Sequence, residues 1–118
     1  LAAKEAAGDA KIFAVTEMSH PGGKTFTAKH GEEMAELGVR CGVSGFIAPA
    51  TRPERIAAIR SVIGDRLILS PGVGAQGGSA ASAIEAGADY VIVGRAIYES
   101  DNPGESAESF REQIAKVL

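Results

Sequence analysis

The sequence predicts an α/β fold, in which four βα units form one half of a (βα)₈ barrel (a TIM barrel). Four short apolar segments recur along the 118-residue chain and alternate with stretches of helical spacing. The segments are apolar throughout, which is typical of strands buried on both faces of a parallel sheet. A whole barrel of this kind needs about 250 residues, so this length accommodates about half of one. We expect residues 1–118 to form a single half-barrel domain, completed by a second half-barrel.

The segments expected as strands are Ile12–Thr16, Phe46–Ala50, Leu67–Ser70 and Tyr90–Gly94. Crossovers of the observed length between successive strands imply parallel pairing. The first and last strands would then be open edges, long, apolar and uncharged, which pair with another chain or aggregate. The partner that this suggests is either an N-terminal half-barrel or a second copy of the chain, which could close eight strands about a two-fold axis.

Capping residues and glycines predict the helix ends. The chain begins like the last turns of a helix that Gly8 closes, as if its start lay upstream. A second helix has one apolar face and a plausible stop at Gly38. The residues of that face are Phe26, His30, Met34 and Leu37. Thr51 and Glu54 have the spacing of a capping box for the third helix.

The third helix should place its isoleucines inward and stop at Gly64. These isoleucines are Ile56, Ile59 and Ile63. Ser79 can cap the next helix, which should end at Gly87. Asn102 can cap the last one with Pro103 at its first position. The apolar residues that this helix should bury are Phe110, Ile114 and Val117.

Composition excludes several classes of function. The net charge of −3 argues against nucleic-acid binding through a basic surface. Cys41 is the only cysteine, so an intrachain disulfide is excluded and a reducing, cytoplasmic location is expected. No apolar run approaches a membrane span, and nothing resembles a signal peptide. We expect no metal site, because the chain has no His-x-x-x-His spacing and no second cysteine. No cofactor is predicted.

The residues at two strand ends predict a phosphate-binding site. Residues 70–78 read S-P-G-V-G-A-Q-G-G and directly follow the apolar run Leu67–Leu69. Such a loop lets the backbone approach an anion, and the N–H groups of a following helix favour negative charge. The fourth strand ends in Gly94 and Arg95, whose guanidinium can form a fork on phosphate.

These motifs together resemble the orotidine 5′-phosphate decarboxylase family, of the archaeal type. The residues that carry the resemblance are T-E-M-S-H-P-G at 16–22, P-A-T-R-P-E at 49–54, the loop at 70–78 and V-G-R-A-I-Y at 93–98. The resemblance covers the whole chain but only the C-terminal half of the family's barrel. It implies binding of a nucleotide monophosphate, orotidine or uridine 5′-monophosphate (OMP or UMP), or of phosphate alone.

The resemblance also implies roles for individual residues. Ser19 matches the serine that hydrogen-bonds the pyrimidine amide edge, and Gln76 the glutamine that bridges phosphate and base. Arg95 matches the phosphate-binding arginine, with an N–H group of Gly94 beside it. Thr51 and Arg52 match a loop that braces a phosphate lid. The lid itself would be the segment 71–78, and its predicted site residues are Pro71, Gly72, Val73, Gly74, Gly77 and Gly78.

The family's catalytic groups are missing from this sequence. The resemblance implies an alternating Lys-Asp-Lys-Asp array that destabilises the departing carboxylate and protonates the carbanion. Asp9-Ala10-Lys11 is a partial match, but Ala14 stands where the second Asp should be, and the match precedes a strand. We interpret these charges as solvated surface. No catalytic residue is therefore predicted in this chain, which should be inactive alone.

Other interpretations stay open. The alternative function is a self-assembling half-barrel scaffold with weak phosphate binding and no activity, and a weaker one is another phosphate-sugar barrel enzyme. His20 beside Pro-Gly is more typical of a loop residue than of a catalytic acid or base. Cys41 near Arg40 is more typical of a small buried filler than of a reactive thiol. Glu17 is expected to order its loop or to pair with a Lys.

Overall fold

The computed structural model describes residues 1–18, 22 and 30–118, and within them one sheet of four parallel strands. The strands lie in chain order, each hydrogen-bonded to the next. Their bounds are β1 Phe13–Val15, β2 Gly45–Ile47, β3 Leu67–Pro71 and β4 Tyr90–Ile92. Parallel strands in consecutive order with intervening helices are the arrangement of a (βα)₈ barrel. The predicted half-barrel is confirmed.

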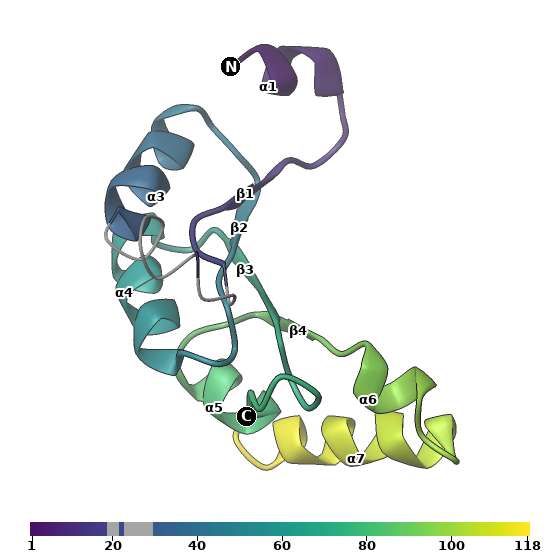
Figure 1. Ribbon diagram of the computed structural model, residues 1–118. Helices are drawn as coiled ribbons and strands as arrows, with labels where there is room; N and C mark the ends of the chain where they lie inside the picture. The colour runs from purple at the N-terminus through teal and green to yellow at the C-terminus, as the bar shows by residue number, and fades with distance from the viewer. Residues whose placement is uncertain (19–21, 23–29) are drawn as a thin grey trace.

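Helices precede, separate and follow the strands along the chain (Figure 1). Their bounds are α1 Ala2–Ala7, α3 Gly31–Arg40, α4 Pro53–Ile63, α5 Ala80–Glu85, α6 Arg95–Tyr98 and α7 Pro103–Ala115. Helices α3, α4 and α5 succeed one another beside the strands, whereas α1 stands apart from the body (Figure 1). The Cα radius of gyration is 14.7 Å, against about 13.5 Å for a compact domain of this length. The chain is therefore more open than a closed globule.

The core lies between the sheet and these helices. Phe46 of β2 and Ile68 of β3 point to the helix side and are fully buried. The three isoleucines of α4 meet them there with 0–1% exposure, as predicted. Phe110 and Ile114 of α7 are partly buried and pack against the edge of this cluster. This layer holds the strand ends, and hence the site, in place.

No helix or strand of the described residues covers the opposite face of the sheet. Side chains alternate along a strand, and those that point away from the helices are markedly exposed in three of the four strands. The exposed fractions are 48% for Val15, 37% for Leu67, 59% for Tyr90 and 47% for Ile92. The expectation that all strands are buried on both faces is therefore wrong for the edge strands. This face corresponds to the interior of a closed barrel, and half a barrel leaves it open.

The edge strands are also shorter than expected. Strands β1 and β4 have three residues each. After β1, Thr16 still donates to the carbonyl of Ile47 through its hydroxyl at 3.1 Å, but the chain then leaves the sheet. After β4, Gly94 already caps α6. Short edges expose fewer unpaired backbone groups than the long edges expected from the sequence.

Two predicted helix ends are wrong. Arg52, rather than Thr51, is the N-cap of α4, and it makes no side-chain capping bond. Proline at 53 explains the difference, because it occupies the first helical position and disfavours helical geometry in the residue before it. Gly38 does not stop α3, which continues to Arg40. Gly38 is buried, and a Cβ there would lie 2.6 Å from Cε1 of the Phe46 ring. Glycine at this position therefore allows the helix to pack closely on the sheet. Leu37, predicted on the apolar face of this helix, is 52% exposed.

The remaining caps are confirmed. Gly8 follows α1 with φ 57°, and Gly64 follows α4 with φ 62°. Ser79 accepts from the Ser82 N–H at 3.2 Å, and Asn102 accepts from the Glu105 N–H at 3.3 Å. Gly87 lies just beyond α5 with φ 113°. These local signals were readable because each acts within three or four residues of the chain.

Arg60 ties the start of β3 to the start of β4, at the end of the sheet opposite the glycine-rich loop. Its guanidinium donates to the carbonyls of Gly64, Arg66 and Gly87 at 2.6 Å each. It also binds Asp89 at 2.6 Å, and Asp89 accepts the Ile68 N–H at 2.7 Å. In barrels of this class the amino ends of the strands are the stabilising face.

Among residues 1–18, 22 and 30–118, no helix is long and apolar enough to cross a membrane. Asp9, Ala10 and Lys11 are all exposed in the connection between α1 and β1. This agrees with their interpretation as solvated surface.

Candidate functional site

The glycine-rich loop after β3 folds back on itself. Three of its glycines have left-handed φ values, 94° at Gly72, 76° at Gly74 and 90° at Gly77. Backbone bonds close the turn: the Gly74 N–H donates to the Gly78 carbonyl at 2.9 Å, and the Gly78 N–H to the Gly72 carbonyl at 3.0 Å. Residues with a Cβ rarely adopt these φ values. The glycines therefore allow a compact loop directly at the end of a strand.

The loop is anchored by contacts with the core and with α6. Val73 is 3% exposed and belongs to the core. A Cβ on Gly74 would lie 2.6 Å from Cβ of Ala96 and 3.2 Å from Cζ of Phe110. Gly74 thus lets the loop backbone lie directly against the start of α6, and this close approach brings Arg95 to the loop.

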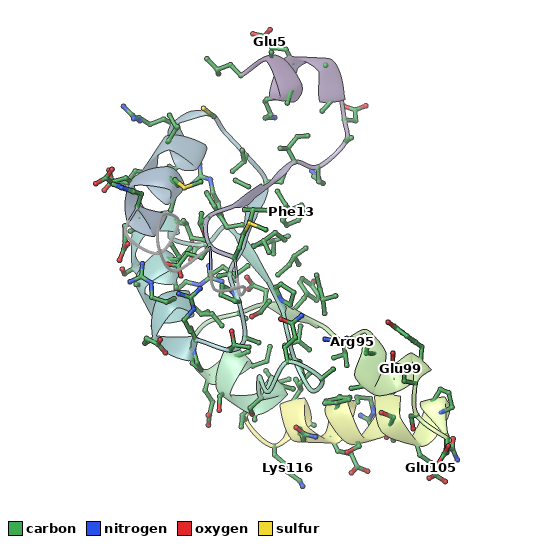
Figure 2. All side chains as sticks on the ribbon, in the orientation of Figure 1. Glu5, Phe13, Arg95, Glu99, Glu105 and Lys116 are labelled. Carbon is green, nitrogen blue, oxygen red and sulfur yellow. The ribbon has the colours of Figure 1, made fainter. Side chains whose placement is uncertain are left out.

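Strand β4 supplies the other side of the site. Gly94, just beyond the strand, is the N-cap of α6, and Arg95 is the first helical residue (Figure 2). Between this end and the loop lies a cavity of about 230 Å³. Its lining residues are Pro71, Gly72, Val73, Ala75, Gln76, Ile92, Gly94, Arg95 and Tyr98. Of these only Arg95 is charged, and Gln76 and Tyr98 add polar side-chain atoms.

The chemistry of the cavity favours a small anion. A guanidinium presents a fork of N–H donors that matches phosphate. Helices α5 and α6 have six and four residues, so their summed dipoles are small, and the expected helix contribution to anion binding is weak. Pockets that enclose a drug-sized ligand measure roughly 300–1,000 Å³. A cavity of about 230 Å³ is therefore of a size for a phosphate group and part of what it carries.

The loop between β2 and α4 contacts the end of β3 and the start of the glycine-rich loop. The Ala50 N–H donates to the Pro71 carbonyl at 2.8 Å, and the Ser70 hydroxyl donates to the Ala48 carbonyl at 2.8 Å. Cγ2 of Thr51 lies 3.5 Å from the position that a Cβ on Gly72 would take. Thr51 thus lies beside the cavity wall, where a bracing residue is expected.

A cluster of charges joins the end of β1 to α3 and α4. The Glu17 side chain is fully buried, with Arg55 Nε at 2.5 Å from Oε1 and Arg52 Nη1 at 3.6 Å from Oε2. Arg55 also binds Glu32 at 2.6 Å, and Arg52 donates to the Met18 carbonyl at 2.7 Å. The bond from Arg55 holds the pKa of Glu32 below its ordinary value, and the two carboxylates together raise the pKa of Arg55. Both shifts favour the charged forms of Glu32 and Arg55.

Comparison with known proteins identifies the family. Residues 1–110 match the sequence profile of the Orotidine 5'-phosphate decarboxylase / HUMPS family. The chain belongs to this family. It is 57% identical over 104 residues to the orotidine 5'-phosphate decarboxylase of Methanococcoides burtonii, covering 87% of this chain and 48% of that protein. For the Thermococcus kodakarensis enzyme the identity is 53% over 109 residues, covering 92% and 51%.

Solved structures of decarboxylases in this family share the fold. The enzyme of Pyrococcus horikoshii superposes with a TM-score of 0.80 at 47% identity, covering 89% of this chain and 51% of that one. The enzyme of Methanocaldococcus jannaschii in complex with the inhibitor BMP gives a TM-score of 0.84 at 39% identity, covering 95% and 52%. The chain thus spans about half the length of the curated relatives it matches. The archaeal-type resemblance inferred from the motifs is confirmed.

Most of the site residues that the decarboxylase resemblance implied lie together. Pro71, Gly72, Val73, Gln76, Gly94 and Arg95 all line the cavity. Gly74, Gly77 and Gly78 shape the loop beside it, and Thr51 lies next to Gly72. Arg52 is directed elsewhere, to Met18 and Glu17. Ser19 and His20 lie outside the described residues.

Some residues of the site were missed by sequence reasoning. Ile92 and Tyr98 line the cavity, and Tyr98 could have been found because it follows Arg95 by one helical turn. Glu17 pairs with two arginines instead of a lysine. Cys41 is half-buried after α3 rather than fully buried. Within the described parts of the chain, no group of His, Cys, Asp and Glu side chains could hold a metal ion.

Proposed function

We propose that this chain is the phosphate- and pyrimidine-binding C-terminal half of an orotidine 5′-phosphate decarboxylase. The whole enzyme would convert OMP to UMP and CO₂ in pyrimidine biosynthesis. The observation that carries the proposal is the cavity between the ends of β3 and β4, with Arg95 and Gln76 in its wall. It occurs in a chain that is 45–57% identical to curated decarboxylases.

The proposal gives a role to each of the predicted site residues except Arg52. Arg95 binds the phosphate of the nucleotide by charge-assisted hydrogen bonds, with the Gly94 N–H beside it. Gln76, on the same wall of the cavity, bridges from phosphate to base. Ser19 binds the amide edge of the pyrimidine, and the segment 71–78 acts as a lid that Thr51 braces. A nucleotide-type ligand is supported by the related M. jannaschii structure, which was solved with the inhibitor BMP.

The chemical step requires groups that this sequence does not supply. Breaking the bond to the carboxylate leaves a carbanion, which must be stabilised and then protonated. We assign that step to the Lys and Asp array of an N-terminal half-barrel. Binding energy from remote groups such as Arg95 accelerates a reaction only when it is realised together with contacts at the reacting atoms. The chain alone should therefore bind the nucleotide without turnover.

The test is the loss of orotidylate absorbance in three samples: this chain, an N-terminal half that carries the Lys-Asp-Lys-Asp array, and their mixture. We expect turnover only in the mixture. The chain with Arg95→Ala, mixed with the same half, should be impaired, which ties the activity to this cavity. Turnover by the purified chain unaided would overturn the division between binding and chemistry.

A second candidate function is a self-assembling half-barrel that binds phosphate weakly and has no activity. The uncovered sheet face, with Val15, Leu67, Tyr90 and Ile92 between 37% and 59% exposed, favours a partner of some kind. A second copy of the chain would serve as that partner in this case, and an N-terminal half in the first. Mass identification of every chain in the purified particle distinguishes the two candidates.

A further inference from the structure

Helix α6 carries Arg95, the charged residue of the cavity, but is too short to be stable by itself (Figure 2). It has four residues, and none of them is buried. Isolated helices of this length are unstable in water, so the surrounding structure has to fix the position of α6. The contacts that α6 makes with its neighbours therefore determine where the Arg95 side chain lies.

Helix α7 contacts α6 through a serine hydroxyl. The two helices lie side by side (Figure 1). Oγ of Ser106 in α7 donates to the Ala96 carbonyl of α6 at 2.7 Å, in a partly buried position. In a longer helix this carbonyl would accept from the N–H four residues later, but the Ser100 N–H donates to the Ile97 carbonyl instead, at 3.1 Å. The hydroxyl thus replaces a backbone donor at the residue directly after Arg95.

The same face of α7 contacts the glycine-rich loop. Phe110 follows Ser106 by four residues, so the two side chains lie on one face of the helix. A Cβ on Gly74 would lie 3.2 Å from Cζ of Phe110 and 2.6 Å from Cβ of Ala96. Phe110 and Ile114 also pack against the core cluster. One face of α7 is therefore anchored on the core and contacts both the loop and α6, the two sides of the cavity.

The start of α7 is fixed by its cap. The Asn102 side chain accepts from the Glu105 N–H at 3.3 Å, and the Asn102 carbonyl accepts from the Ser106 N–H at 3.1 Å. Ser106 therefore lies in the capped first turn of a 13-residue helix. This gives its hydroxyl a defined position from which to bind α6.

We propose that Ser106 is a positioning residue for Arg95, because its hydroxyl fixes the backbone next to Arg95 and so keeps the guanidinium at the cavity. This inference rests on the proposed function, which assigns the phosphate to Arg95. Ser106 is not among the residues that line the cavity, and it is not assigned any contact with ligand. It acts through the Ala96 carbonyl, while Phe110 keeps the same helix face against the loop.

The test measures the affinity of the full chain for inorganic phosphate, by amide chemical-shift titration. For Ser106→Ala we expect Kd to rise by roughly threefold to tenfold, since displacement of a positioned group by about 1 Å costs up to about a hundredfold. Ser109→Ala is the matched control, because Ser109 lies on the same helix and is exposed. Its Kd should stay within about twofold of the native value, the usual limit for independent sites.

A double-mutant cycle separates positioning from a general effect on the fold. If Ser106 acts through Arg95, Ser106→Ala should not weaken phosphate binding further in a chain that already carries Arg95→Ala. A general loss of folded structure would weaken binding by the same factor in both backgrounds.

Amide hydrogen exchange gives a second readout, which needs no ligand. The N–H groups of residues 97–99 donate to the carbonyls of Gly94 and Arg95 within and around α6. They should exchange faster in Ser106→Ala than in the native chain or in Ser109→Ala, because α6 opens more often without the bond from α7. Unchanged exchange at these residues would refute the hold of Ser106 on α6.

The binding outcomes separate this inference from the proposed function. Native-like phosphate affinity in Ser106→Ala, or the same fractional loss with and without Arg95, would overturn the positioning role and leave the phosphate site standing. If Arg95→Ala binds phosphate as well as the native chain does, the phosphate site itself is wrong, and the role of Ser106 is overturned with it.

Discussion

Arg95 carries the charge of the cavity, since the other residues that line it are neutral. It is exposed at the start of α6 and lies outside the core. For Arg95→Ala we expect binding of UMP or inorganic phosphate to weaken by about 1.5–3 kcal/mol, the contribution of a charge-assisted hydrogen bond. This corresponds to roughly one to two decades in Kd. Calorimetric titration of both ligands measures the effect.

The control for this change is Arg111→Ala, which removes an exposed arginine far along the chain in α7. Its phosphate affinity should equal that of the native chain, and thermal unfolding should show both variants folded. Native-like affinity in Arg95→Ala would make Arg95 a structural residue and would leave the cavity without its cation.

Glu32 gives a prediction about pH. Its pKa lies below the ordinary value of 4.5 because Arg55 donates to it. A lowered pKa in the folded state means that ionised Glu32 stabilises the fold above about pH 4.5, and that this contribution is lost as the pH falls through the folded value. Glu32→Gln should therefore flatten the dependence of the unfolding free energy on pH below about pH 5. Urea unfolding at several pH values, with Glu36→Gln on the same helix as control, measures it; equal slopes for the two variants would contradict it.

The sequence indicated the phosphate residues better than the charge cluster, for a physical reason. The loop at 70–78 and Arg95 each follow a strand, and the ends of neighbouring parallel strands meet at one edge of a sheet. Glu17, Glu32 and Arg55 come from three separate segments, and only the folded chain brings them together. A buried carboxylate at a strand end gives no periodic signal in the sequence. Its partners could therefore not be assigned.

At the scale of the elements, the glycine-rich loop can be tested with two glycines of the same turn. Both Gly74 and Gly77 have left-handed φ values, 76° and 90°. An alanine at either position should cost about 1–2 kcal/mol in backbone strain. Gly77 has nothing within 4 Å of its added Cβ, whereas that of Gly74 would lie 2.6 Å from Cβ of Ala96. Gly74→Ala should therefore push the loop away from α6 as well.

The expected result is a difference between these two variants. Gly77→Ala should lower stability but keep phosphate affinity to within about twofold. Gly74→Ala should lower stability further and should also weaken phosphate binding, because the loop and Arg95 lose their close approach. Chemical denaturation and phosphate titration measure both quantities. Equal phosphate affinities would show that the contact between the loop and α6 does not shape the site.

Elements were predictable where local rules act alone. Each of the caps at Ser79 and Asn102 depends on a hydrogen bond from the backbone N–H three residues later, and both bonds are present. The capping box at Thr51 failed because Pro53 imposes its own geometry on the helix start. Gly38 failed as a stop because the Phe46 ring occupies the space beside it. In the first case a stronger local rule prevailed, and in the second tertiary packing did.

At the scale of the whole molecule, the four-strand parallel order was predictable from repeated strand–helix spacing alone. The exposure of one sheet face could not be predicted, because the sequence of an apolar strand is the same whether the barrel is closed or open. In a closed barrel the inward side chains fill the interior. Here Val15 and Ile92 remain about half exposed. The sequence pattern is therefore that of a barrel with its second half in place.

The uncovered face leads to a prediction about association. A bare apolar sheet face and two open edges should make the isolated chain self-associate or pair with a complementary half, rather than remain a monomer. Leu67→Lys places a charge on that face, at a side chain 37% exposed, and should reduce association. Leu37→Lys is the matched control, since Leu37 is 52% exposed on α3, away from the sheet. Sedimentation at micromolar concentration, alone and with an N-terminal half, measures both. A well-folded native monomer, or equal association of the two lysine variants, would show that the sheet face is not the contact surface, and the self-assembling half-barrel would then lose its support.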